Sequence, residues 1–499
     1  MIFEMKFRST SNKAKYVYKS AVQKFFFNNS SLKEEVEEFE INIGLKINKV
    51  LRELFIKEKK FDLELVKPSG NPDLIFIQKV DISKSFTADF FRNSLSAIVP
   101  KLKDQPLRNL HVFIPEYSLF QDTFDNEEYY YQTFVEGILL GNYTFDIYKT
   151  EEKQVKSFQI TFHSGNPRKV KDAISKAEKT ISAVYFARDL ANEPAITLTP
   201  NELAQRAKKE LGEAGVKVTI FNDKELKKRN MNAILAVGKA SSNPPKLIIM
   251  RYKPKSKAKR KIALVGKGVT YDSGGLSIKP TDGMIEMKAD MAGAAAVIGI
   301  IKSVALLNLP FELIGVVPAV ENMISGNSYK PSDIVSTASG KTIEVKNTDA
   351  EGRIVLADAL EYASKQKPDE IIDFATLTGA AVVALGLPTA AIFTKNEEMA
   401  DFLYKSGQKT FERVWRLPLW DEYDKLIESD IADVSNLGGR WGGAITAAKF
   451  LEHFVDENIP WTHVDLAGPS IKHDFTSYTK KYNTGFGVRL ITDYLEKLK

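Results

Sequence analysis

From residue 193 to its end, the chain alternates short β-rich runs with longer segments that have helical spacing. The predicted strands lie at 216–221, 246–252, 261–265, 312–317, 342–345, 370–374 and 461–466. Strands that alternate with helices form mostly parallel sheets whose two faces those helices cover. The pattern therefore predicts an α/β fold with a central mixed, largely parallel sheet flanked by helices.

The length of the chain predicts two domains. It has 499 residues, whereas a single hydrophobic core seldom extends beyond about 250–300 residues. Residues 1–165 mix strand-like and amphipathic segments, and we expect a smaller N-terminal α/β domain with an oligomerisation or regulatory role. Residues 166–192 have the spacing of a connecting helix. Residues 193–499 are expected to form the larger C-terminal domain.

Several classes of protein are excluded by what the sequence lacks. The chain has no cysteine, which rules out disulfides, iron–sulfur ligation, zinc–thiolate sites and a thiol nucleophile. Its N-terminus lacks the apolar core and cleavage site of a signal peptide, so a cytoplasmic location is expected. The long apolar region 292–320 is interrupted by Lys302, Asn308, Pro310 and Glu312. A membrane span needs about 20 nearly uninterrupted apolar residues, so this region is predicted to be a buried helix followed by a buried strand.

The charge balance gives only a weak indication of a nucleic-acid partner. Seventy basic residues against sixty-four acidic ones leave a formal net charge of +6, a small excess for this length. The most basic stretch, 253–261, lies between two apolar runs. It is predicted to be a solvated connection between strands, with a phosphate-binding patch as the alternative.

Charged residues gather at joints where a predicted strand ends or a helix begins, which is where ligands bind in open α/β sheets. The Gly-rich segment 265–275 carries Lys267 and Asp272 among glycines that let backbone approach a ligand. Phosphate binding is the alternative there, although the Walker spacing is absent. Asp290 lies near the start of an apolar, Ala-rich helix, where a buried acid needs a partner. A favourable interaction with the helix dipole is the alternative for Asp290.

The segment Asn-Thr-Asp-Ala-Glu-Gly-Arg at 347–353 is the most informative of these joints. Asp349, Glu351 and Arg353 are two residues apart, so in extended backbone they project to one side. The following helix start, 354–360, is apolar and predicted to be buried, which makes unpaired carboxylates costly. The pattern therefore predicts a bound cation.

Together these joints predict an oxygen-rich pair of metal sites formed by Asp272, Asp290, Asp349 and Glu351. Lys267 can be a ligand only as a neutral amine, and both burial and a nearby cation lower the pKa of a lysine. The five histidines are too scattered for a histidine-based metal site, and His463 is predicted to be structural.

These residues and spacings resemble the leucine aminopeptidase family of dinuclear metallopeptidases, also called the cytosolic aminopeptidases or peptidase family M17. The family's Asn-Thr-Asp-Ala-Glu-Gly-Arg segment is unchanged at 347–353, and Lys267, Asp272, Lys279 and Asp290 follow the family's order and spacing. Further similarity runs through 373–379, 432–439, 443–448, 465–468 and 484–487. The resemblance covers the second domain, whereas the first hundred residues contribute little to it.

The resemblance implies a ligand set for each of two metal ions. Lys267, Asp272, Asp290 and Glu351 would hold one ion, and Asp272, Asp349 and Glu351 the other. Lys279 and Arg353 would be the catalytic side chains, with a bicarbonate near Arg353 as general base. Mn or Zn is expected at the two sites, and Mg and Co are further candidates.

The resemblance also implies a substrate class, namely peptides with a free N-terminus from which leucine and other apolar residues are removed. Positions of the substrate pocket match Met287, Asn347, Thr376, Leu377, Gly379 and Ala467. Two departures from the family pattern, Arg440-Trp441 and Pro469-Ser470, bear on substrate preference. A homohexamer is the expected assembly.

Three alternatives to an active aminopeptidase remain at this point. A carboxylate pair beside a Gly-rich lysine loop is also compatible with a metal-dependent phosphate ester hydrolase. Some members of the family bind DNA, for which the basic stretch 253–261 is a candidate surface. A relative that has lost activity is the third, although every ligand and catalytic position keeps the expected residue type.

Overall fold

The computed structural model describes residues 2–11, 16, 19–27, 31–58, 61–67, 71–81, 86–151 and 155–498. The chain forms two compact units, Met1–Ile181 and Ser182–Lys499. The long helix α5 (Pro167–Asn192) crosses the boundary between them. The functional division predicted at 165 and 192, with its roles for the two domains, stays a prediction.

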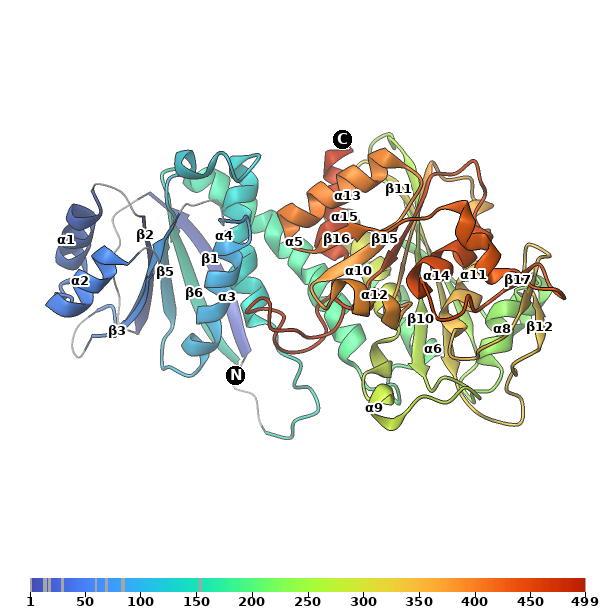
Figure 1. Ribbon diagram of the computed structural model, residues 1–499. Coiled ribbons are helices and arrows are strands. Elements are labelled where there is room, and N and C mark those ends of the chain that lie inside the picture. The colour runs from blue at the N-terminus through green and yellow to red at the C-terminus, as the bar shows by residue number, and fades with distance from the viewer. Residues whose placement is uncertain are drawn as a thin grey trace. The chain divides into compact units, whose positions relative to one another are not determined.

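The N-terminal unit is built on a six-stranded sheet of order β1-β6-β5-β2-β4-β3 (Figure 1). Its strands are β1 (Ile2–Thr10), β2 (Ser20–Phe27), β3 (Phe61–Val66), β4 (Leu74–Val80), β5 (Asn109–Phe113) and β6 (Val155–His163). All neighbouring strands are parallel except β3 and β4. Helices α1 (Leu32–Ile43) and α2 (Lys49–Lys57) pack on one face, and α3 (Phe90–Lys103) and α4 (Glu127–Asn142) on the other.

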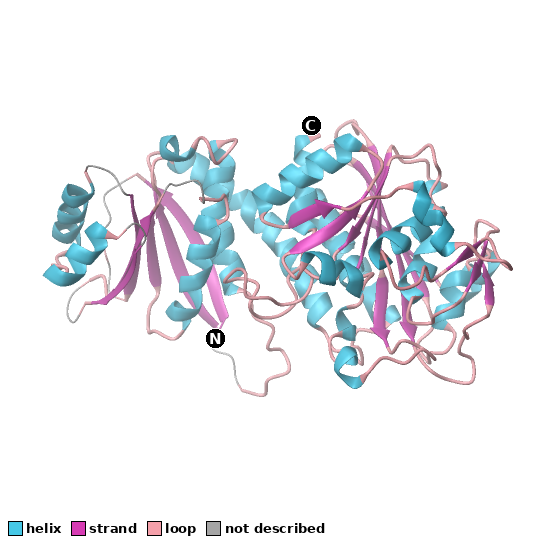
Figure 2. Ribbon diagram, in the orientation of Figure 1, coloured by secondary structure: helices cyan, strands magenta, loops and turns pink. Residues whose placement is uncertain are grey.

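The C-terminal unit contains a nine-stranded sheet of order β16-β15-β18-β14-β9-β11-β8-β7, with β10 paired to β11 (Figure 2). Its strands are β7 (Lys217–Phe221), β8 (Lys246–Tyr252), β9 (Lys261–Gly266), β10 (Gly268–Asp272), β11 (Glu312–Asn322), β14 (Glu370–Ala375), β15 (Thr389–Phe393), β16 (Arg413–Arg416) and β18 (Trp461–Asp465). The central strands β18, β14, β9 and β11 are parallel, whereas β7, β8 and β15 introduce antiparallel pairs. The predicted α/β class with a mixed, largely parallel sheet is confirmed.

One predicted strand lies outside this sheet. Residues 342–344 form β13, which pairs with β12 (Ile334–Ser336) and β17 (Val434–Ser435) in a separate three-stranded sheet. The run has a single buried residue, Ile343, between two partly exposed ones. A central strand of a covered sheet is buried on both sides, so this alternation suits a small surface sheet.

Helices cover both faces of the large sheet (Figure 2). They are α6 (Pro200–Glu213), α7 (Asp223–Lys228), α8 (Asn232–Gly238), α10 (Ala292–Leu307), α11 (Glu351–Ser364), α12 (Gly379–Leu385), α13 (Glu397–Thr410), α14 (Gly443–Glu452) and α15 (Val488–Lys497). The short helix α9 (Thr281–Met284) has no buried residue. Both α10 and α11 contact β9, β11 and β14. Side chains alternate between the two faces of a strand. Ala263 and Val265 of β9 belong to the core cluster of α11, so the intervening Ile262 and Leu264 face the α10 side.

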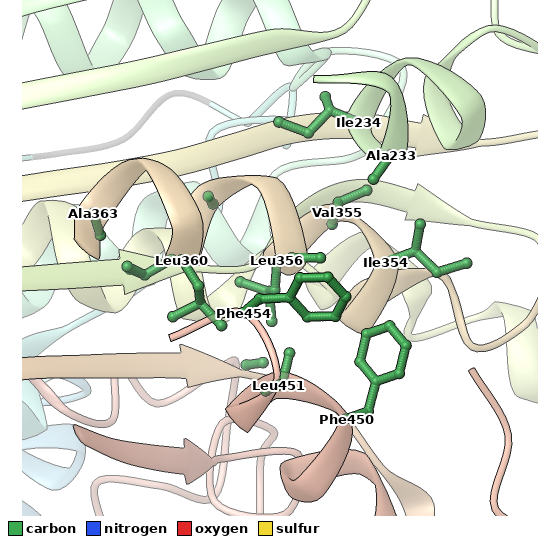
Figure 3. Close-up of a cluster of buried hydrophobic side chains, with 14 of the residues drawn as sticks. Ala233, Ile234, Ile354, Val355, Leu356, Leu360, Ala363, Phe450, Leu451 and Phe454 are labelled. Atoms are coloured by element: carbon green, nitrogen blue, oxygen red, sulfur yellow. The ribbon is translucent and has the colours of Figure 1, made fainter. Parts of the chain in front are cut away.

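The core around α11 joins three helices (Figure 3). Leu356 and Leu360 of α11 lie among buried residues of α8 and α14, including Ile234 and Phe450. Every residue from Glu351 to Leu360 is buried, as predicted for this helix start. The first turn of α11 is therefore fixed by packing, and so are the functional groups that it carries.

The stretch Thr281–Leu307 is long and apolar enough to cross a membrane, judged by length and composition alone. Within its most apolar window, 78% of the residues are buried inside the protein. The interior helix of a globular domain passes the same test, and α10 packs directly on the central strands. The structure thus shows the buried helix and buried strand that the sequence predicts for 292–320.

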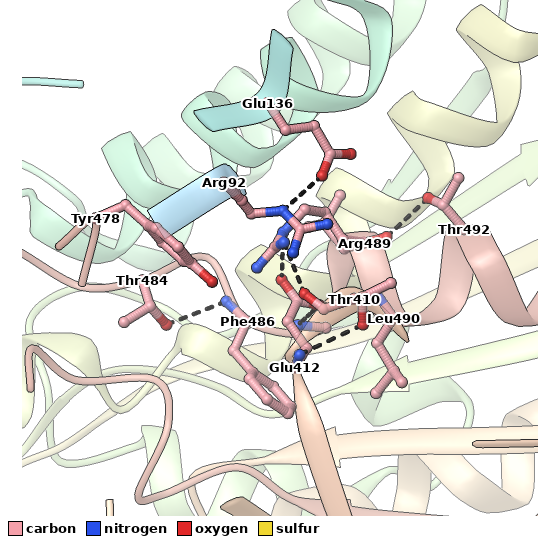
Figure 4. A network of polar contacts seen from close by, with 12 residues as sticks. Arg92, Glu136, Thr410, Glu412, Tyr478, Thr484, Phe486, Arg489, Leu490 and Thr492 are labelled. Carbon is pink, nitrogen blue, oxygen red and sulfur yellow. Dashed lines mark hydrogen bonds and ion pairs between the residues drawn. The ribbon is translucent and has the colours of Figure 1, made fainter. Parts of the chain in front are cut away.

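A buried carboxylate holds the start of the C-terminal helix α15 (Figure 4). Glu412 Oε2 accepts hydrogen bonds from the backbone N of Gly487 (3.0 Å) and of Leu490 (2.8 Å), and Arg489 Nε donates to Oε1 (3.2 Å). A negative charge is favourable beside the free N–H groups of a helix N-terminus. Glu412 thereby anchors α15 beside β16.

The pH dependence of the free energy of unfolding tests the protonation state of a second buried acid, Glu370. Burial raises the pKa of its carboxyl from 4.5 to about 7, against hydrogen bonding from Tyr494 and the charge of Arg260. Between these values the unfolded chain has released the proton and the folded protein keeps it, so the free energy of unfolding falls as pH rises. Glu370→Gln removes this loss, worth at most about 3 kcal/mol. We expect the melting temperature of the variant, relative to wild type, to be higher at about pH 8 than at about pH 5.

The exposed Glu457 provides the control for this measurement. Glu457→Gln should follow the wild type at both pH values. A difference in melting temperature between Glu370→Gln and the wild type that stays the same at both pH values would refute the raised pKa of Glu370.

Candidate active site

Three buried carboxylates converge at one end of the large sheet. Asp272 is the last residue of β10, Asp290 lies in the turn before α10, and Glu351 begins α11. Each offers one oxygen atom, and these three atoms lie within 4.8 Å of one another. They lie where parallel strands end and helices begin, the usual position of an α/β ligand site.

Two lysines bind these carboxylates. Lys267 Nζ lies 2.7 Å from Asp290 Oδ1 and 2.9 Å from Glu351 Oε1, and it donates to the backbone O of Thr376 (3.0 Å). Lys279 Nζ lies 2.9 Å from Asp272 Oδ2 and 2.5 Å from Asp349 Oδ1. The structure therefore brings all five predicted metal-ligand residues and Lys279 into one network, here called the carboxylate–lysine network.

The pKa of Lys267 is raised in this network, whereas the sequence analysis expects it to be lowered. Burial lowers the pKa of Lys267, but the negative charges of Asp290, Glu351 and Asp272 outweigh burial and raise it above its ordinary value. The protein's own groups thus favour the ammonium form. The predicted neutral amine requires the additional positive charge of a bound cation, which repels the proton.

The pKa values of three acids in the network are raised, which favours their protonated forms. Burial raises the pKa of Asp290 and of Glu351, and the charge of Asp272 adds to both shifts. Burial also raises the pKa of Asp349. Carboxylates held this close without enough positive charge repel one another.

The donor set fits a divalent cation. Asp290 Oδ2 and Glu351 Oε2 are buried and have no hydrogen-bond partner among the described residues. A buried carboxylate oxygen without a partner is costly, and carboxylate oxygens are suitable ligands for Mg and Mn and also bind Zn. The network therefore has both the excess negative charge and the free ligand atoms that a metal site requires.

The extended arrangement predicted for Asp349, Glu351 and Arg353 is wrong. Ala350 is the N-cap of α11, so Glu351 and Arg353 are helical and Asp349 lies in the preceding turn. Asp349 and Glu351 still reach the same network because the chain turns around it. Arg353 is buried, and it forms no ion pair with the described part of the chain. Its Nε also lacks a hydrogen-bond partner among these residues.

A set of amide and hydroxyl groups that the sequence analysis missed holds the loop before α11. Asn322 Nδ2 donates to Asp272 Oδ1 (2.8 Å) and to the backbone O of Thr348 (3.0 Å). The hydroxyl of Tyr329 donates to the same backbone O of Thr348 (2.7 Å). Asn436 Nδ2 donates to the backbone O of Asn347 (2.7 Å). Asn322 ends β11, so applying the strand-end rule to that strand would have found it.

The predicted pocket residues lie beside this network. Thr376 Oγ1 donates to Asp290 Oδ1 (2.8 Å), and the backbone O of Met287 accepts from the backbone N of Asp290 (3.3 Å). Asn347 Oδ1 accepts from the backbone N of Asp349 (2.7 Å). The remaining positions are placed on two neighbouring segments: Leu377 and Gly379 follow β14, and Ala467 follows β18.

Asp465 joins these two segments and was also missed. Its buried carboxylate accepts from the backbone N of Leu377 (3.1 Å), from the backbone N of Ala467 (3.2 Å) and from Thr378 Oγ1 (2.7 Å). Asp465 is the last residue of β18, beside Ala375 of β14. A single side chain thereby fixes the spacing of both predicted pocket walls.

The fold and this site together define an α/β protein with a buried, carboxylate-rich centre of the kind with which metallohydrolases hold cations. Residues 185–492 match the catalytic domain of the Cytosol aminopeptidase family. The chain belongs to this family, as its sequence pattern predicts. It is therefore a metal-dependent aminopeptidase, a hydrolase that acts on peptides.

Similar proteins span most of the chain. A probable cytosol aminopeptidase of Geobacter sp. (strain M21) is 48% identical over 365 residues, which are 72% of this chain and 74% of that protein. One of Aquifex aeolicus (strain VF5) is 42% identical over 429 residues, 85% of each chain. Among solved structures, the bottromycin maturation enzyme BotP in complex with Mn has a TM-score of 0.81 at 31% identity, covering 96% of this chain and 99% of that one.

The close approach of α11 to Lys267 provides a first test of the site. A Cβ atom at Gly352 would lie 2.5 Å from Lys267 Cε and 2.7 Å from its Nζ, too close for the lysine to keep its position. We expect Gly352→Ala to lower kcat/KM at least about 100-fold, because displacements near 1 Å have such effects. Gly212→Ala in α6, where no atom lies within 4 Å of the new Cβ, is the matched control. Activity of Gly352→Ala within about tenfold of wild type would contradict the placement of Lys267.

The role of Asp465 in positioning the pocket predicts a change in selectivity. Asp465→Ala leaves three donors without their acceptor, each a loss of about 1–3 kcal/mol, so the walls are no longer held together. We expect KM for leucine amide to rise and the ratio of kcat/KM for leucine amide over alanine amide to fall about tenfold. Asp465→Asn retains one carbonyl acceptor and should restore part of this ratio. An unchanged ratio in a folded Asp465→Ala variant would rule out the positioning role.

Proposed function

We propose that the carboxylate–lysine network binds two divalent cations and removes leucine and other apolar residues from the N-termini of peptides. Lys267, Asp272, Asp290 and Glu351 are the ligands of one cation. Asp272, Asp349 and Glu351 are the ligands of the other, so Asp272 and Glu351 bridge. The observation that carries the proposal is the convergence of four carboxylates on only two ammonium groups.

Mn and Zn are the proposed metals, with Mg and Co as further candidates. When bound, such a pair of cations polarises a carbonyl group and lowers the pKa of water. The structural relative BotP is known in complex with Mn, which supports Mn. The carboxylates of Asp290 and Glu351 have free oxygen atoms to offer to any of these ions.

Lys279 is proposed to stabilise the oxyanion that develops on the scissile carbonyl. Its side chain is 17% exposed, whereas that of Lys267 is 4% exposed, so Lys279 is the more accessible of the two. Asp272 and Asp349 hold its ammonium group and raise its pKa against the effect of burial. A fixed positive charge of this kind stabilises a transition state without reorganisation.

Arg353 is proposed to orient a bicarbonate that acts as general base. Burial lowers the pKa of the Arg353 guanidinium to about 10, against the charges of Glu351 and Asp465, so it remains charged at neutral pH. Among the described residues it has no ion-pair partner, and its Nε has no acceptor. A buried guanidinium with free donors is well suited to a small bidentate anion.

The preference for leucine and other apolar residues rests on the composition of the pocket. Met287, Leu377 and Ala467 present partly exposed apolar groups next to the network, together with Asn347, Thr376 and Gly379. Apolar pockets discriminate by about 1–3 kcal/mol for each methylene group. Leucine, methionine and phenylalanine are therefore all proposed as first residues.

A homohexameric assembly and a cytoplasmic location are proposed from the family resemblance, and relatives of this chain are named cytosol aminopeptidases.

The phosphate ester alternative loses support, because Lys267 is buried and bound to Asp290 and Glu351. The basic residues 253–260 form the mostly exposed connection between β8 and β9. No contact distinguishes this connection as a DNA-binding surface.

Metal removal tests the proposed function. We expect hydrolysis of leucine amide by the purified protein to be lost on chelation and restored by Mn or Zn. Glu351→Gln should remain inactive with either metal and bind fewer ions per chain, measured by mass spectrometry of the metals, because a bridging ligand has lost its charge. Glu457→Gln, on the exposed surface, is the matched control. Hydrolysis that survives complete chelation would refute the proposal.

A further inference from the structure

A lysine lies on the apolar face of the N-terminal sheet that packs against α1. Val22 and Phe26 of β2 are fully buried in the core beneath this helix. Side chains alternate between the faces of a strand, so Lys24, which lies between them, points to the same side. In the sheet Lys24 is the register partner of Phe113 in β5. Lysine is rarely found in such a position unless it is paired.

The ammonium group of Lys24 has aromatic neighbours and no charged partner. It forms no ion pair or hydrogen bond with the residues that the structure describes, and its Nζ lies 5.5 Å from the ring centroid of Phe26 and 5.7 Å from that of Phe113. Burial lowers the pKa of Lys24, and the charges of Glu35 and Glu38 oppose this shift without reversing it. A ligand that brings a negative charge to Lys24 therefore stabilises its ammonium form.

Lys24 lines a cavity of about 310 Å³ between the sheet and α1, here called the N-terminal pocket. Three aromatic residues, two carboxylates, an amide and one ammonium group form its lining: Tyr16, Phe39, Phe113, Glu35, Glu38, Asn42 and Lys24. The four lining residues of α1 are spaced as i, i+3, i+4 and i+7, so they share one face of the helix. Pockets for small ligands have volumes of about 300–1,000 Å³, and this one is suited to a small molecule.

The charges of the N-terminal pocket define the chemistry of its ligand. Lys24 comes from the sheet side, whereas Glu35 and Glu38 come from the helix side. A phosphate-bearing ligand would be repelled by the two carboxylates, and a simple amine would be repelled by the lysine. A small zwitterion satisfies both sides, and an apolar or aromatic group on it suits the aromatic walls.

We propose that the N-terminal pocket binds a free α-amino acid with an apolar or aromatic side chain. Lys24 pairs with the carboxylate of the ligand, and Glu35 and Glu38 pair with its ammonium group. The rings of Phe39 and Phe113 contact its side chain. Free amino acids are the products of an aminopeptidase, so this pocket gives the N-terminal unit a site for the product class of the reaction. The inference does not depend on the metal ligands proposed for the carboxylate–lysine network.

Binding of labelled L-phenylalanine to the full-length protein, measured by equilibrium dialysis, tests this site. Chelation separates it from a site that depends on metals, and we expect one saturable site per chain to survive chelation. Lys24→Met keeps an apolar side chain of similar length and should weaken binding at least about tenfold, the size of a hydrogen bond to a charged group. Phenethylamine and 3-phenylpropionate each lack one of the two charges, and both should compete at least about tenfold less well than phenylalanine.

Lys33→Met, at an exposed position of α1 outside the pocket lining, is the matched control and should bind phenylalanine like the wild type. If Lys24→Met does not fold, the double variant Glu35→Gln/Glu38→Gln decides, with an expected loss of affinity of about two- to fivefold. The inference would be overturned by the absence of a saturable site after chelation, or by wild-type affinity in a folded Lys24→Met variant. Competition by the amine or the acid as strong as that by phenylalanine would overturn it as well.

Discussion

The buried position of the Lys267 ammonium group between Asp290 and Glu351 is the interaction on which the site depends. Asp290 precedes α10, Glu351 begins α11, and these two helices pack on opposite faces of the central strands. One lysine at the end of the sheet therefore ties both helical layers together. Removing a single partner from such a buried pair costs about 3–5 kcal/mol, because an uncompensated charge is left behind.

Close backbone approach makes this arrangement sterically feasible. At Gly293, in the first turn of α10, a Cβ atom would lie 2.1 Å from the backbone O of Phe374 in β14. At Gly352 it would collide with Lys267. Glycine at these two positions lets the starts of both helices reach the strand ends. The buried charges can then meet within hydrogen-bond distance, and the excess of carboxylate over ammonium remains for a cation.

The sequence predicted the parts of the fold and site that local pattern determines. Apolar runs marked β8, β9 and β11, because strands that are buried on both faces of a sheet are apolar on both faces. Charged residues where a strand ends or a helix begins marked Lys267, Asp272 and Asp290, since such groups need a functional reason to be there. The arrangement of Asp349 and Glu351 was mispredicted because the backbone changes from a turn to a helix between them. Asp465 and Asn436 were missed because each acts on residues almost ninety positions away in the chain.

These long-range anchors also explain how the unchanged segment 347–353 coexists with departures from the family pattern at other positions. Asp465 and Asn436 hold their partners mainly through backbone N–H and C=O groups, so the positions they fix depend little on which side chains line the pocket. Substitution at the predicted lining positions therefore changes the local surface while the carboxylates of the carboxylate–lysine network keep their places. Arg440 and Trp441 project from a loop that is anchored in this way at its start. The side chains of this loop can therefore vary without disturbing the buried charges of the carboxylate–lysine network.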